Sequence, residues 1–266
     1  MSDVTQLFKR LSWSAVLIGV AIYTIFLAPS WFFLIVVEAF VILGLLEYFS
    51  LAERKGFFIN RYIGLTFGAL LPFPHYFSGE SIILMVAILC LFVFNFHRRL
   101  KEHAMVSTAL TLFGLVYVGW FFSFLTKIHA LTHGAFWIFY LILIIKAGDA
   151  AAYFVGKKFG AHKYIVHVSP NKSVEGAVSG FLVTFLLSLL SKLYLGQVSI
   201  SHLAVLGALF GILGQLGDLA ESLLKRDAGV KDSGAIPGLG GILDVIDSLL
   251  LTIPVLYYYL LAFQPY

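Results

Sequence analysis

Apolar runs of about 20 residues recur along the whole chain, and short polar segments separate them. A run of this length suits an α-helix that crosses a bilayer. The runs are continuous and do not alternate between apolar and polar residues, which argues against a membrane β-barrel. The pattern therefore predicts an all-α, polytopic membrane protein with nine spans. We place them at 11–28, 31–50, 60–77, 81–97, 105–125, 134–156, 175–195, 201–226 and 238–263.

The composition agrees with this pattern. Of the 266 residues 60% are hydrophobic and only 12% are charged, whereas soluble domains carry about 25% charged residues. The first run follows Lys9 and Arg10 but lacks a clear small-x-small cleavage site, so we expect it to be retained as a helix. The single cysteine, Cys90, lies inside an apolar run and excludes an internal disulfide.

The basic residues are sorted by loop. With nine spans the termini lie on opposite sides, and a cytoplasmic N-terminus places most of the 18 lysines and arginines in cytoplasmic segments. We therefore predict a cytoplasmic N-terminus in the cytoplasmic (inner) membrane. Because the net charge of +4 is explained by this sorting, it is no sign of nucleic-acid binding. Every polar cluster discussed below then faces the cytoplasm, where nucleotides are found.

The first polar cluster joins Lys146 and Asp149 near the cytoplasmic end of the sixth run. It could serve a site, or it could be an ordinary ion pair at positions i and i+3 of one helix. The second cluster precedes the seventh run, where Ser169 or Ser173 could cap the helix. Open amides at such a helix start attract phosphate, and Asn171 and Lys172 lie beside them. The alternative is a plain cap with a lysine that meets anionic lipid.

The third cluster, residues 217–247, holds six acids and three bases around a Gly-Pro-rich turn. Charge inside a membrane is costly unless it is paired or bound to an ion. Hard carboxylate oxygens close to phosphate-binding bases suit Mg²⁺. The alternative is a set of ion pairs, with Asp218 or Glu221 paired to Lys225 or Arg226. The other members are Asp227, Asp232, Asp244, Asp247 and Lys231, and Ser222 shares a helix face with Asp218, Glu221 and Lys225.

Together the three clusters resemble the phosphatidate cytidylyltransferases, or CDP-diacylglycerol synthases. The resemblance covers roughly residues 140–255. It lacks the family's His between the glycines, which is Leu239 here, and its Arg after Asp244, which is Val245. The matching positions are Asp149 before Ala152-Tyr153 and Gly156, Ser169 to Gly176, Gly217-Asp218, Glu221-Ser222, Lys225-Arg226, Lys231-Asp232, Pro237-Gly238, Gly240-Gly241, Asp244 and Asp247.

The resemblance implies that CTP and phosphatidate, a membrane lipid, give CDP-diacylglycerol and pyrophosphate. Asp218 and Asp244 would then hold Mg²⁺, with room for a second cation. Lys225 and Arg226 would join these two acids in catalysis. The implied substrate-binding residues are Lys172, Ser169, Asn171, Ser173, Lys231, Asp232, Asp149, Glu221, Ser222 and Asp247.

Two other functions stay open. A CTP-dependent polyprenol or phytol kinase would transfer the γ-phosphoryl group to an alcohol, and a transporter would move an anionic solute. We expect residues 1–133 to form generic transmembrane helices and 134–266 to form a catalytic region that faces the cytoplasm. The oligomeric state is left open, with a homodimer as one option.

Overall fold

The structure, a computed structural model, describes residues 19–73, 79–98, 103–234 and 240–263. In these ranges the regular structure is helical, and the one isolated β-bridge between named residues joins Lys163 to Ser173. The all-α expectation is therefore confirmed for the described part of the chain.

Within the described residues, six helical segments are long and apolar enough to cross a membrane. The nine spans predicted from the sequence are not confirmed by these six segments. Residues 19–26 are helical, but the start of the first predicted span lies outside the described residues. The third predicted span holds only α3, Arg61–Leu70, because Pro72 cannot continue a helix. The six segments are Ser30–Arg54, Ala104–His129, Gly134–Phe159, Val174–Leu193, Ile200–Asp227 and Ile242–Phe263.

The chain folds into two compact units. The first comprises residues 1–130 and 227–245, and the second comprises 131–226 and 246–266. The first unit thus takes in the segment that carries Lys231, Asp232 and Asp244. Whether the C-terminal half is the catalytic region stays a prediction.

The first unit is built on α2, Ser30–Arg54, which packs against α3. Glycines allow this close approach, since a Cβ at Gly64 or Gly68 would collide with side chains of α2. The other helices are α4 (Glu80–Arg98), α5 (Ala104–Gly114), the π-helix η2 (Leu115–Trp120) and α6 (Phe121–His129).

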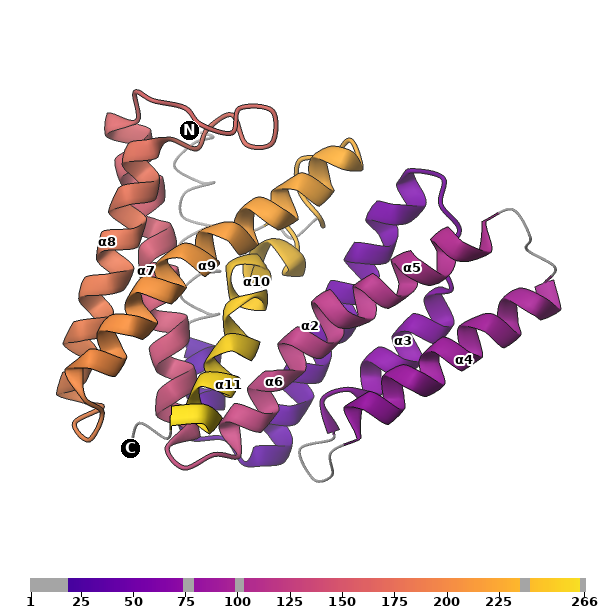
Figure 1. The fold of residues 1–266 in the computed structure, drawn as a ribbon, viewed down its shortest axis with the longest axis horizontal. Helices are drawn as coiled ribbons and strands as arrows, with labels where there is room; N and C mark the ends of the chain where they lie inside the picture. The colour runs from indigo at the N-terminus through magenta and orange to yellow at the C-terminus, as the bar shows by residue number, and fades with distance from the viewer. Residues whose placement is uncertain (1–18, 74–78, 99–102, 235–239, 264–266) are drawn as a thin grey trace. The chain divides into compact units, whose positions relative to one another are not determined.

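The second unit contains α7, Gly134–Phe159, and α8, Val174–Leu190, which run side by side (Figure 1). Small residues at their contact let the backbones approach, as in many membrane helix pairs. A Cβ at Gly180 would lie 3.0 Å from Cβ of Ala152. The remaining helices are the short η3 (Ser191–Leu193), α9 (Ile200–Asp227) and α11 (Thr252–Phe263). Helix α10 (Ile242–Leu250) begins in the first unit and ends in the second.

Candidate active site

The start of α8 is capped by a serine, as the sequence predicts. Oγ of Ser173 accepts a hydrogen bond from the backbone N–H of Gly176 at 3.2 Å. The preceding segment folds back onto this start, because Val174 N–H donates to the carbonyl of His162 at 2.8 Å. The Glu175 carboxylate lies 2.6 Å from Nδ1 of the same histidine. Of the two candidate caps, the structure selects Ser173.

A cavity of about 540 Å³ lies beside this helix start, within the second unit. Its volume falls in the range of small-molecule sites. Its wall is built from the last turns of α7, the segment before α8, the first turn of α8 and the middle of α9. Of the predicted site residues, the cavity brings together Asp149, Asn171, Lys172, Ser173 and Asp218.

Glycines shape the wall of this cavity where α7 meets the start of α8. A Cβ at Gly160 would lie 2.5 Å from Oγ of Ser173, and one at Gly176 would lie 2.7 Å from the carbonyl oxygen of Ala152. Neither contact can be accommodated without a shift of the backbone or of the cap. Gly160 and Gly176 therefore have a packing reason, and Gly176 is also one of the positions that match the family motif.

Three lysines and two aspartates are the charged side chains that line the cavity. Lys157, Lys163 and Lys172 line the cavity, and of these only Lys172 was predicted from the sequence as a site residue. Lys163 donates from Nζ to the carbonyl of Asn171 at 3.1 Å, which places its charge at the segment that precedes α8. Lys163, in the short segment before the capped helix start, could have been found from its place beside Lys172 in that segment.

Lys172 pairs with an acid from another helix. Its Nζ lies 2.9 Å from Oδ2 of Asp218, and both side chains are partly exposed. Ser222 Oγ reaches Oδ1 of the same aspartate at 3.4 Å. Tyr164, also in the cavity wall, has a pKa raised first by burial and then by the charge of Asp218. These contacts tie α9 to the segment before α8.

Three acids and a lysine form a second group within the same unit. Lys146 Nζ lies 3.3 Å from Oδ2 of Asp149, so the i, i+3 pair expected as the alternative exists. Ser248 Oγ donates to that oxygen at 2.9 Å and accepts from Lys146 at 2.9 Å. Asp247 is buried beside them and interacts electrostatically with Lys146, Asp218 and Asp149.

The ion-pair alternative also holds for Glu221 and Lys225. They form a salt bridge on α9, and the glutamate side chain is fully buried. Arg226, next along the helix, donates from Nε to the carbonyl of Val168 at 3.0 Å and so braces the segment before α8. The predicted catalytic roles of Lys225 and Arg226 stay predictions.

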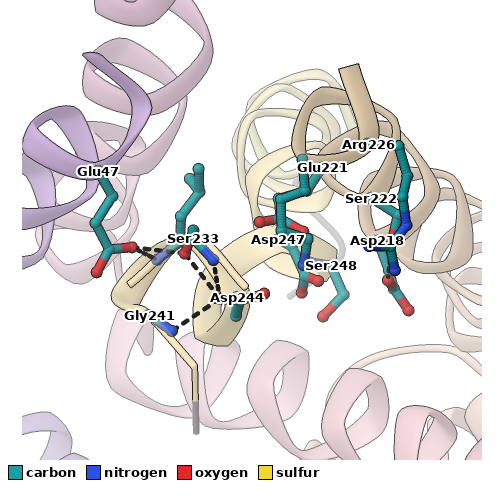
Figure 2. A network of polar contacts seen from close by, with 12 residues as sticks. Glu47, Asp218, Glu221, Ser222, Arg226, Ser233, Gly241, Asp244, Asp247 and Ser248 are labelled. Carbon is teal, nitrogen blue, oxygen red and sulfur yellow. Dashed lines mark hydrogen bonds and ion pairs between the residues drawn. The ribbon is translucent and has the colours of Figure 1, made fainter. Parts of the chain in front are cut away.

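The first unit holds the other part of the motif. Oδ2 of Asp244 accepts three hydrogen bonds, from Ser233 N–H, Ser233 O–H and Gly241 N–H, each at 2.8 Å (Figure 2). Lys231 and Asp232 are exposed. Pro237, Gly238 and Leu239 lie outside the described residues. Sequence reasoning assigned no role to Glu47, which contacts this segment from α2.

The acids of the second unit suit a divalent cation. Lys146 pairs with Asp149 and Lys172 pairs with Asp218, so the nearby Asp247 adds a carboxylate beyond these two pairs. Across the described part of the chain, no group of three metal-binding side chains is arranged to hold an ion alone. Mg²⁺ is commonly held through one or two carboxylates together with substrate phosphates, so this arrangement fits it.

Comparison with known proteins decides the family. A model described as "Cytidylyltransferase family" matches residues 8–263. The chain belongs to the cytidylyltransferase family. The match extends over both units.

Individual family members differ in how much of the chain they match. The phosphatidate cytidylyltransferase of Bacillus subtilis is 42% identical over 153 residues, 56% of this chain and 56% of that protein. The protein of that name from Chlamydia muridarum is 38% identical over 63% of this chain and 59% of its own length. The one from Haemophilus influenzae is 29% identical over 96% of this chain and 98% of its own. The aligned region thus spans little more than half of the first two relatives and nearly all of the third.

Proposed function

We propose that this family member transfers the cytidylyl group of CTP to phosphatidate, giving CDP-diacylglycerol and pyrophosphate. The observation that carries the proposal is the cavity at the start of α8, lined by Lys157, Lys163 and Lys172. Three cations beside a helix start suit a polyphosphate, because the helix dipole and the lysines attract the same charge. The names of the relatives supply the lipid substrate.

In the proposed reaction an oxygen of the phosphatidate phosphate attacks the α-phosphorus of CTP. The bond from that phosphorus to the bridging oxygen breaks, and pyrophosphate leaves with its electron pair. Both reactants are anions, so the protein must neutralise charge and align them for in-line attack. Since phosphatidate is already a nucleophilic anion, the reaction needs no strong general base.

The cavity lysines take the phosphate-binding roles in this proposal. Lys172 would exchange its contact with Asp218 for a CTP phosphate, and Lys163 would stay near the same segment through Asn171. Lys225, Arg226 and Lys231 remain the further predicted phosphate contacts. The other predicted substrate-binding residues are Ser169, Ser173, Asp149, Glu221, Ser222, Asp232 and Asp247.

We propose that Asp218 and Asp244 hold Mg²⁺, with a second cation as an option. When bound, Mg²⁺ would offset the charge that develops on the phosphoryl oxygens. The carboxylates would hold the ion through hard oxygens, and Lys172 would then be available to the substrate in place of its contact with Asp218. Chelation should abolish turnover, and added Mg²⁺ should restore it.

We further propose that the chain spans the cytoplasmic (inner) membrane nine times with its N-terminus inside. The six long apolar helices support a multi-pass protein. A lipid substrate and a cytoplasmic nucleotide both suit an active site that opens on the cytoplasmic face. A homodimer is one assembly compatible with the proposal.

The experiment is an assay of the purified protein in detergent with CTP and phosphatidate, with the products separated by chromatography. Formation of CDP-diacylglycerol with release of pyrophosphate supports the proposal. Release of CDP together with phosphorylation of a polyprenol would favour the lipid kinase. Solute movement into vesicles, with no reaction of CTP, would favour the transporter.

A further inference from the structure

Helix α10 begins directly after a glycine, and its first amides are satisfied by a residue from a distant helix. Backbone N–H groups of Ile242 and Leu243 donate to the carboxylate of Glu47 at 2.9 and 2.8 Å. A helix usually obtains such bonds from a serine, threonine or aspartate at the capping position. Gly241 has no side chain, so Glu47 supplies the cap from α2 (Figure 2).

The glycine makes room for this carboxylate. A Cβ at Gly241 would collide with Oε2 of Glu47 and Oγ of Ser233, and one at Gly234 would lie 2.5 Å from Oε1 of Glu47. Gly234 and Gly241 therefore both lie close against the Glu47 side chain. No L-residue with a Cβ fits either place unless Glu47 moves.

Glu47 is also linked to Asp244 through one hydroxyl. Oγ of Ser233 lies 2.8 Å from Oε2 of Glu47 and 2.8 Å from Oδ2 of Asp244. A hydroxyl has a single proton, so Ser233 donates to one carboxylate at a time. Asp244 in turn reaches back to the N–H of Gly241, as the third residue of a helix does in a capping box.

We infer that Glu47 is a positioning residue that fixes the start of α10 and thereby the orientation of the Asp244 carboxylate. The inference rests on the proposed function, in which Asp244 holds the cation. In this network Oδ2 of Asp244 accepts from the N–H and O–H of Ser233 and from the N–H of Gly241. Hydrogen bonds of this kind fix the orientation of a carboxylate, as supporting partners of metal ligands do.

The test variant is Glu47→Gln, which keeps the shape but removes the charge and one acceptor oxygen. The matched control is Glu53→Gln on the same helix, where the carboxylate pairs with Arg61 at the surface at 3.5 Å. Wild-type protein is assayed first with CTP and phosphatidate. If the wild type is inactive, the proposed function fails. The inference about Glu47 is judged separately, by the kinetic differences between active variants and the wild type and by hydrogen exchange at the α10 amides.

For Glu47→Gln we expect the Mg²⁺ concentration for half-maximal rate to rise about tenfold, and kcat to fall by a similar factor. The KM for CTP should stay within about twofold of wild type, since Glu47 does not line the cavity. Hydrogen exchange at the Ile242 and Leu243 amides should become faster. Glu53→Gln should match wild type in all of these measurements.

A second variant keeps the inference testable if Glu47→Gln does not fold. Ser233→Ala removes the shared hydroxyl but leaves the hydrogen bonds between Glu47 and the first amides of α10. It should raise the Mg²⁺ concentration for half-maximal rate without changing hydrogen exchange at those amides. Where both variants fold, the double variant should lose less than the product of the single losses, because the two residues act as one unit. The inference would be overturned if the loss in the double variant equalled the product of the two single losses. It would also be overturned if either single variant kept the Mg²⁺ requirement of the wild type.

Discussion

Lys172, in the segment before α8, lies with its Nζ 2.9 Å from Oδ2 of Asp218 on α9. The pair joins two motifs that are 46 positions apart in the printed sequence, and both residues line the cavity. Since both side chains are partly exposed, the pair adds at most about 1 kcal/mol of stability. A contact this weak can be exchanged for substrate phosphate or metal without loss of the fold.

Lys172→Ala should therefore impair binding more than folding. We expect the KM for CTP to rise about tenfold, or about 1.4 kcal/mol, with little change in thermal stability. The control is Lys158→Ala, which removes a lysine that lies over the Phe159 ring and outside the cavity lining. Steady-state kinetics of both variants in detergent provide the measurement. Equal effects of the two substitutions would contradict a phosphate role for Lys172.

Lys225 should act differently, because its partner is buried. Lys225→Ala leaves the fully buried Glu221 without its cation, which we expect to cost about 3–5 kcal/mol of stability. The double variant Lys225→Met with Glu221→Gln should recover most of the lost thermal stability. If the double variant is folded and active, Lys225 serves the fold alone; if it is folded and inactive, the predicted phosphate contact stands.

Tyr164 offers a readout of the cavity that does not depend on turnover. Burial raises its pKa above the ordinary value, and the charge of Asp218 raises it further. Asp218→Asn removes the second cause, so the pKa of Tyr164 should move down toward the ordinary value. The measurement is the pH-dependent tyrosinate absorbance, with Tyr164→Phe identifying the contribution of this phenol. A pKa that stays the same or rises in Asp218→Asn would mean that the two side chains do not interact in solution.

Much of the local structure could be predicted from the sequence, because it depends on neighbouring residues. Ser173 precedes an apolar run and caps its helix, and Lys146 and Asp149 meet at i, i+3 spacing. Pro72 falls inside the third predicted span, and α3 ends before it at ten residues. These features follow from helix geometry and proline chemistry alone.

The long-range contacts could not be predicted in this way. Glu47 reaches amides 195 and 196 positions away, and nothing in its own surroundings along the chain points to α10. The resemblance favoured phosphate for Lys225, whereas the fold places the side chain against Glu221. Pairing across helices depends on tertiary packing, which a single sequence does not display.

The nine-span topology remains a prediction with a simple check. A reporter fused after Tyr266 should be active only on the non-cytoplasmic side, because an odd number of spans places the termini on opposite sides. Fusions within the segment before α8, near Lys163, should report the cytoplasm. Cytoplasmic activity of the C-terminal fusion would mean an even number of spans.

The most direct measurement of the central claim follows the α- and γ-phosphates of CTP with separate labels. The purified protein, with Mg²⁺ and phosphatidate, should place the α-label in the lipid and the γ-label in pyrophosphate, in equal amounts. Asp218→Asn should do neither, while Asp227→Asn, an exposed acid paired with Lys55 at 2.7 Å, should behave as wild type. Appearance of the γ-label in the lipid would contradict cytidylyl transfer and identify a kinase.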